Sequence, residues 1–156
     1  MPCAVTKTLP ILGRPLIDFL DTSVLVAVFL ADHQHHAASM NLFSQIELGQ
    51  AFCAAHSLVE TYSTLTRLPA PHRATAEEAD LFLDVVCERL QSVSLDAAEQ
   101  RAALRDATAS GIVGGAVYDF MNASCALKVR ADALFAWNLK HYNRFSQVSN
   151  IVRSPA

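Results

Sequence analysis

No apolar run in this sequence reaches the roughly 18 residues that a membrane-spanning helix needs, so we expect no membrane segment. The first residues, MPCAVTKTLPILGRP, lack both a continuous apolar core and a small-residue cleavage site, which argues against a signal peptide. We expect residues 1–16 to form a loose N-terminal arm. An excess of basic residues is also missing, since the net charge is −3. Any contact with nucleic-acid phosphates must therefore come from a local basic patch or from a metal ion.

The sequence also lacks closely spaced cysteines. Cys3, Cys53, Cys87 and Cys125 lie far apart and form no CxxC pattern of the kind found in zinc sites and redox motifs. Three of the four lie in apolar segments, where a free cysteine behaves as a small hydrophobic residue. We therefore expect reduced thiols and a cytoplasmic protein.

Internal repeats, low-complexity tracts and linkers are absent, and a length of 156 residues favours one domain, which we assign to residues 17–156. The composition, 52% hydrophobic and 17% charged, excludes a disordered chain. Such an apolar excess is typical of a sheet that helices bury on both faces. It is also typical of a subunit that hides an apolar face in an oligomer.

Short apolar segments alternate with longer amphipathic ones along the chain. The short segments predict a parallel sheet of four to five strands, at residues 17–20, 51–55, 92–95, 133–137 and, as the fifth, 147–152. The longer segments predict helices at residues 23–31, 34–49, 57–68, 76–90, 96–110 and 116–129. This alternation indicates an α/β fold with helices flanking a central sheet, in which sites form beyond the carboxyl ends of the strands.

Four oxygen-bearing side chains are predicted at that edge of the sheet. Asp21 follows the first strand, Glu60 and Asp119 lie in the first turns of two later helices, and Asn138 follows the fourth strand. If they converge, three carboxylates and an amide form an oxygen-only cluster that suits Mg²⁺ or Mn²⁺ rather than Zn²⁺. Such ions hold phosphates and lower the pKa of a bound water.

Taken one at a time, these acidic residues have simpler explanations. Asp21 is a suitable helix cap, and the carboxylate of Asp119 suits a helix N-terminus. The spacing of Ser57 and Glu60 matches a capping box, in which Glu60 reaches back to the Ser57 backbone. Only their joint placement favours a metal site.

Three blocks of the sequence, FLDTSVLVA, HSLVETYSTLTRL and GGAVYDFMNASCALKVRADALFAWNLKHYNRF, resemble the signature segments of PIN-domain nucleases, specifically the VapC toxins of bacterial toxin–antitoxin pairs. The resemblance runs from about Ile17 to Pro155. It implies a PIN-like fold and an endoribonuclease that depends on Mg²⁺ or Mn²⁺, with metal ligands at Asp21, Glu60 and Asp119. It also implies a homodimer and inhibition by a cognate VapB-type antitoxin.

The last signature position of this family, commonly Asp or Asn after a Thr or Ser, falls on Asn138, while the hydroxyl position is occupied by Ala136. Compared with the Asp and Thr found in many family members, Asn138 and Ala136 supply less negative charge and one oxygen fewer. This departure puts a second metal ion in doubt. Asp132 is nearby in sequence, but it precedes the fourth strand and should lie at the strand's opposite end. Asn138 or, less favourably, Asp132 would complete the site.

Five further polar residues are candidates for contacts with the substrate: Ser23, Arg67, Lys140, His141 and Arg144. Helix capping is an equal explanation for Ser23, and an exposed charged loop is an equal explanation for the three residues after Asn138. Arg67 closes the helix that bears Glu60, where it suits the helix dipole, and this is the stronger explanation for it. The histidines at 33, 35 and 36 are expected on a solvated face rather than at a metal. Trp137 and Tyr142 could stack an unpaired base, but packing in or beside the core is the stronger expectation.

These observations combine into one hypothesis, hydrolysis of RNA phosphodiester bonds by a toxin of a toxin–antitoxin pair. Two alternatives keep the fold: a PIN-domain RNA-processing nuclease without a toxin role, and a catalytically weakened binding module. A phosphoacceptor receiver domain is also doubly wound, but it requires adjacent acidic residues on the first strand, whereas Asp18 and Asp21 are separated.

Overall fold

The computed structural model describes residues 14–156, so most of the predicted N-terminal arm, residues 1–16, lies outside the described residues. Five parallel strands form one sheet in the order β3-β2-β1-β4-β5. The strands are β1 (Asp18–Leu20), β2 (Ala51–Ala54), β3 (Leu90–Val93), β4 (Ala133–Phe135) and β5 (Val152–Arg153). The predicted α/β fold with a central parallel sheet is confirmed.

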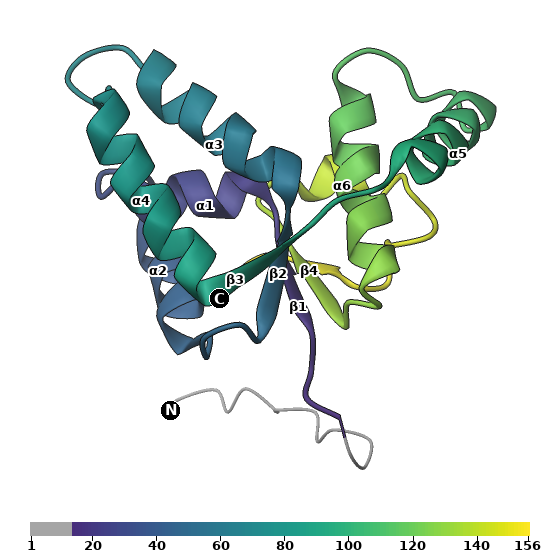
Figure 1. The fold of residues 1–156 in the computed structure, drawn as a ribbon, viewed down its shortest axis with the longest axis horizontal. Coiled ribbons are helices and arrows are strands. Elements are labelled where there is room, and N and C mark those ends of the chain that lie inside the picture. The colour runs from purple at the N-terminus through teal and green to yellow at the C-terminus, as the bar shows by residue number, and fades with distance from the viewer. Residues whose placement is uncertain (1–13) are drawn as a thin grey trace.

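Helices cover both faces of the sheet, and Figure 1 shows α1 to α4 on one side of the strands and α5 and α6 on the other. The helices are α1 (Thr22–Phe29), α2 (His36–Gln45), α3 (Ala55–Arg67), α4 (Ala76–Arg89), α5 (Ala97–Ala109), α6 (Ala116–Lys128) and α7 (Leu139–Tyr142). Two of them begin at capping boxes, α4 at Thr75 with Glu78 and α5 at the expected Asp96 with Glu99. No helix within residues 14–156 combines the length and apolarity that crossing a membrane requires.

Two apolar cores result from the period-2 alternation of the short strands. Phe19 and Leu134 point into the core that contains α5 and α6, whereas their neighbours Leu20 and Phe135 belong to the core that contains α1, α2 and α4. Both faces of these strands are therefore buried, which explains why they read as continuous apolar runs.

Several boundaries differ from the predictions. The helix predicted from Ser57 begins two residues earlier, at Ala55, and the strand predicted at 92–95 is Leu90–Val93. The last predicted strand is only two residues long, because residues 147–150 form turns in which Val148 is buried in the core. The apolar residues of this segment therefore indicate that single side chains are buried, and not that the backbone is extended.

Candidate active site at the carboxyl edge of the sheet

A cleft of about 570 Å³ opens beyond the carboxyl end of β1. Its lining residues are Asp21, Thr22, Ser23, Val26, His33, Gln34, His35, Glu60, Thr64, Asp119, Trp137 and Asn138. All four residues of the predicted oxygen cluster are among them. The sheet order accounts for three of them, because β2, β1 and β4 are neighbours and the segments that follow these parallel strands lie at the same edge. Asp119 reaches this edge on α6, which follows α5.

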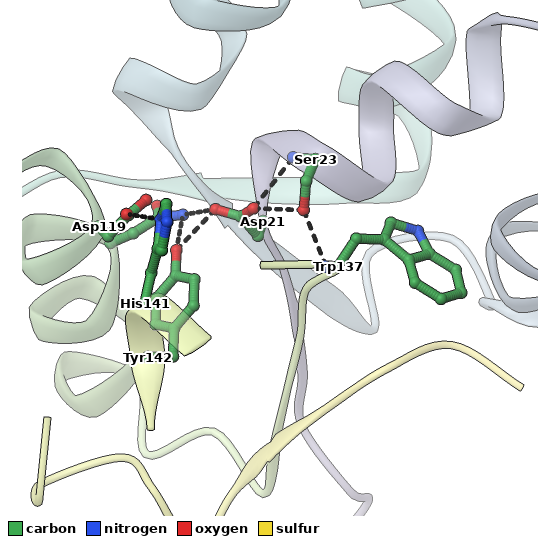
Figure 2. Close-up of polar contacts among 7 residues, drawn as sticks. Asp21, Ser23, Asp119, Trp137, His141 and Tyr142 are labelled. Atoms are coloured by element: carbon green, nitrogen blue, oxygen red, sulfur yellow. Dashed lines mark hydrogen bonds and ion pairs between the residues drawn. The ribbon is translucent and has the colours of Figure 1, made fainter. Parts of the chain in front are cut away.

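Asp21 is the most firmly held of the four, with 4% of its surface exposed. Its Oδ2 accepts hydrogen bonds from the Ser23 backbone N–H (3.0 Å) and hydroxyl (2.6 Å), so it is the N-cap of α1, as the simpler explanation required. Its Oδ1 accepts from the Asn122 amide (2.5 Å) and the Tyr142 hydroxyl (2.6 Å). Figure 2 shows Asp21 between Ser23 on one side and Tyr142 on the other. Capping and placement in the cleft are therefore properties of the same carboxylate.

Tyr142 is fully buried, which confirms the stronger expectation of core packing and rules out the weaker one that it stacks an unpaired base. Burial and the neighbouring charge of Asp21 raise the pKa of its phenol well above the usual value. The phenol therefore remains protonated and acts as a hydrogen-bond donor to Asp21. Its role is inside the protein, beneath the cleft.

Glu60 does not take part in a capping box. The N-cap of α3 is Ala54, which places Glu60 in the second helical turn, and Ser57 turns inward to donate to Asn122 (3.2 Å). Glu60 instead faces the cleft, where its Oε2 accepts a hydrogen bond from the Thr22 hydroxyl at 2.8 Å. The two-residue earlier start of α3 is the reason that both expectations, the first-turn position and the cap, fail.

Asp119 lies in the first turn of α6, as predicted, and its Oδ2 is 2.8 Å from Nδ1 of His141 (Figure 2). Burial and the charge of Asp21 raise the pKa of the Asp119 carboxyl, and His141 and Arg144 oppose this shift. The ionised form of Asp119 is therefore disfavoured in the folded protein, mainly because of burial.

The donor set of the cleft suits a hard divalent cation, because it consists of carboxylate, hydroxyl and amide oxygens and includes no cysteine. The unfavourable charge at Asp119 is of the sign that a cation relieves. Within residues 14–156, however, no group of three or more His, Cys, Asp or Glu side chains is arranged to hold a metal ion. Each carboxylate is instead bonded to a protein group, but Glu60 is bonded only through Oε2 and Asp119 only through Oδ2 within the described residues, so each retains an oxygen that can bind a cation.

The fourth corner of the cluster is occupied by Asn138, which is exposed and lines the cleft. Asp132 lies at the opposite edge of the sheet, as expected, where it accepts hydrogen bonds from the Ile17 backbone N–H and from Arg14. Ala136 is fully buried in the core that contains α6. The geometry therefore favours Asn138 over Asp132 as the residue that completes the cluster.

The other candidate substrate contacts are dispersed. The Ser23 hydroxyl donates to Asp21 and accepts from the Trp137 backbone N–H (3.0 Å). Arg67 lies two turns beyond Glu60 on α3, about 10 Å further along the helix and outside the cleft lining. Lys140 and Arg144 are exposed beyond the rim. Of the basic candidates, only His141 contacts a residue of the acidic cluster.

The histidine segment forms a wall of the cleft that the sequence did not predict. His33 and His35 line the cleft, and the His35 ring stacks on Trp137 with centroids 3.7 Å apart and an angle of 5°. The indole N–H of Trp137 donates to the Ser39 hydroxyl (2.8 Å), which fixes the ring. Burial and the neighbouring imidazoles lower the pKa of His33. These rings belong to the rim of the site, and not to a merely solvated face.

Sequence reasoning missed Asn122 altogether and misjudged Ser57. A usable signal was present, because Ser57 precedes Glu60 by three residues and Asn122 follows Asp119 by three. Residues at that spacing lie on the same face of a helix. Polar residues one turn from predicted site carboxylates were therefore candidates for supporting them.

A sequence model of the family described as PIN domain matches residues 19–140. The chain belongs to the PIN domain family. Among its PIN relatives, ribonuclease VapC40 of Mycobacterium tuberculosis is 37% identical over 100 residues, covering 64% of this chain and 70% of that protein. Ribonuclease VapC27 of the same species is 36% identical over 114 residues, covering 72% and 79%. The family predicted from the three sequence blocks is confirmed.

Solved VapC structures share the PIN fold of this chain. Mycobacterium tuberculosis VapC20, described as a toxin that cleaves the sarcin–ricin loop, superposes with a TM-score of 0.68 at 16% identity over 82% of this chain and 95% of its own. DNA-bound VapBC from Salmonella typhimurium superposes with a TM-score of 0.62 at 19% identity over 91% and 100%. At these identities the superpositions establish the fold alone.

Proposed function

We propose that this PIN-domain protein is an endoribonuclease that depends on Mg²⁺ or Mn²⁺ and acts as the toxin of a VapBC-type pair. One observation carries the proposal: Asp21, Glu60 and Asp119, from three separate segments, line one cleft in a chain whose relatives are VapC ribonucleases. Oxygen donors of this kind select hard cations, which are suited to phosphodiester hydrolysis.

In the mechanism that we propose, the three carboxylates hold the cation, and Asn138 offers a neutral oxygen beside them. When bound, the cation would bind the scissile phosphate and lower the pKa of an attacking water, so that in-line attack leaves 5′-phosphate and 3′-hydroxyl ends. Lys140 and Arg144, exposed beyond the rim, offer positive charge to neighbouring phosphates, and His141 orients Asp119.

The partners follow from the same assignment. The solved VapBC structures contain an antitoxin with the toxin, so we expect a VapB-type antitoxin to bind and inhibit this chain. A homodimer and a cytoplasmic location remain predictions, the first from the resemblance and the second from the scattered cysteines.

The decisive experiment is cleavage of a defined single-stranded RNA panel with Mn²⁺, with EDTA, and with the Asp119→Asn variant. We expect EDTA to abolish cleavage and Asp119→Asn to reduce the rate by at least about 100-fold while leaving the circular dichroism spectrum unchanged. Asp84→Asn is the matched control, because Asp84 is exposed on α4, away from the cleft lining. Cleavage by Asp119→Asn at the wild-type rate would refute the assignment.

A specific observation favours a second candidate, a PIN module that binds RNA without cleaving it. Ala136 contributes no hydroxyl and Asn138 contributes no charge at the last signature position. Isothermal titration with Mn²⁺ separates the two, because the module would bind RNA but would show no saturable uptake of Mn²⁺.

A further inference from the structure

Three polar side chains beneath the cleft form a continuous chain of hydrogen bonds that ends on Asp21. The Ser57 hydroxyl donates to Oδ1 of Asn122 (3.2 Å), and Nδ2 of Asn122 donates to the Tyr142 hydroxyl (3.0 Å) and to Asp21 (2.5 Å). The Tyr142 hydroxyl then donates to the same oxygen of Asp21 at 2.6 Å. Exposed fractions are 0% for Ser57 and Tyr142 and 2% for Asn122, so water does not compete for these bonds.

The direction of every bond in this chain is fixed by chemistry. An ionised carboxylate only accepts, so the amide of Asn122 must turn its nitrogen toward Asp21 and its oxygen toward Ser57. The single proton of Tyr142 goes to Asp21, which leaves its oxygen free to accept from Asn122. Both N–H groups of the amide are therefore used, and a fully satisfied buried network of this kind holds its members in one arrangement.

The chain also connects the elements that carry the acidic cluster. Ser57 lies one turn before Glu60 on α3, and Asn122 lies one turn after Asp119 on α6. Tyr142 ends α7, for which Asn138 is the N-cap. A shift of any of these helices against β1 would break a bond to the chain and would also displace the acidic residue that the helix carries.

We propose that Ser57, Asn122 and Tyr142 are positioning residues that orient the Asp21 carboxylate and keep α3, α6 and α7 in register for binding a divalent cation. The proposal rests on the proposed function, because it concerns the same site. Asn122 and Tyr142 do not line the cleft, whereas Ser23 does. The chain therefore holds Oδ1 from the inside, and Oδ2, which accepts its hydrogen bonds from the cleft-lining Ser23, is the oxygen on the side of the cation.

The test compares two pairs of variants that remove one hydroxyl each. Ser57→Ala and Tyr142→Phe remove the first and last donors of the chain. Thr61→Val is the control for Ser57→Ala, because Thr61 lies one turn further along α3 with a buried hydroxyl that has no partner within the described residues. Tyr62→Phe, at an exposed tyrosine of the same helix, is the control for Tyr142→Phe.

Two quantities are measured for each variant: the Kd for Mn²⁺ by isothermal titration, well below the unfolding temperature, and hydrogen exchange of the Asn122 side-chain amide by NMR in EDTA. We expect both chain variants to raise the Mn²⁺ Kd by about tenfold, the lower end of the range for groups that orient metal ligands. We also expect them to accelerate exchange of the Asn122 amide, whereas both controls should match the wild type. If Ser57→Ala does not fold, Tyr142→Phe carries the test.

A role in stability alone would lower the unfolding temperature of the chain variants and leave their Mn²⁺ Kd at the wild-type value, and that result would overturn the proposal. A lower Kd in either chain variant would overturn it as well. Failure of the proposed function is distinguishable, because the wild type itself would then neither bind Mn²⁺ nor cleave RNA.

Discussion

Replacing Asp21 by Asn should destabilise the protein, although the two side chains have the same shape. The carboxylate accepts four hydrogen bonds, two at each oxygen, from Ser23, Asn122 and Tyr142. An amide has one oxygen and one NH₂ group, so two of these donors must face another donor. The ionised Asp21 is costly to bury, but these donors offset that cost in the wild type.

The magnitude follows from the better of the two amide orientations. With its nitrogen toward Ser23, the variant loses the cap of α1, which costs about 1 kcal/mol. The bonds from Asn122 and Tyr142 persist but lose their charge assistance, at a cost of roughly 1 kcal/mol each. The expected loss is therefore about 3 kcal/mol, or a fall in Tm of roughly 6–12 °C for a domain of this size.

Urea unfolding followed by circular dichroism at 222 nm, in EDTA at pH 7, measures this loss. Asp119→Asn is the informative comparison, because the raised pKa of Asp119 means that its charge opposes folding. That variant should be at least as stable as the wild type, although both variants should lose cleavage. An Asp21→Asn protein within 1 kcal/mol of the wild type (a limit set by the usual worth of one hydrogen bond, about 1 kcal/mol) would refute the argument from the four donors.

Three further predictions concern pH, thiols and salt. The pKa of Asp119 is raised in the folded protein, so protonation of this carboxyl stabilises the fold. The stabilisation is fully present below the ordinary Asp pKa and is lost as the pH rises through the raised pKa. The free energies of unfolding of the wild type and Asp119→Asn, measured in urea, should therefore converge as the pH is lowered. In a Cys3→Ser background, Ellman's reagent should modify the exposed Cys87 fast, and Cys53 and Cys125 only on unfolding. The reason is that burial raises the pKa of Cys53 to about 12 and of Cys125 to about 11. Equal rates of modification for the three thiols would contradict this. Replacing Lys140 and Arg144 by Ala should reduce the salt dependence of RNA binding by roughly 0.7 in log–log slope per lost phosphate contact, and an unchanged slope would remove both from the RNA surface.

The sequence alone determined the class of fold and the edge of the sheet at which the candidate site lies. Strands buried on both faces and helices with caps such as Asp96 are local patterns, so periodicity and capping residues predict them without knowledge of the rest of the chain. Asp21 and Asn138 follow predicted strands, and parallel strands end at a shared edge. Their convergence with Glu60, on the helix that follows the next strand, was therefore predictable in outline, whereas Asp119 lies on a helix that follows another helix. The three signature blocks added the family.

Only the tertiary structure decided which atoms of the site are bonded to one another. Ser57 has the spacing of a capping residue with Glu60, yet its hydroxyl belongs to Asn122, and Tyr142 points inward to Asp21 rather than outward to a base. These partners are 65 and 121 residues apart in the chain. Their pairing depends on the order of the strands and on the packing of α3, α6 and α7 against β1. A hydrogen bond of about 3 Å forms only when whole elements are correctly placed, whereas local sequence preferences act within a few residues.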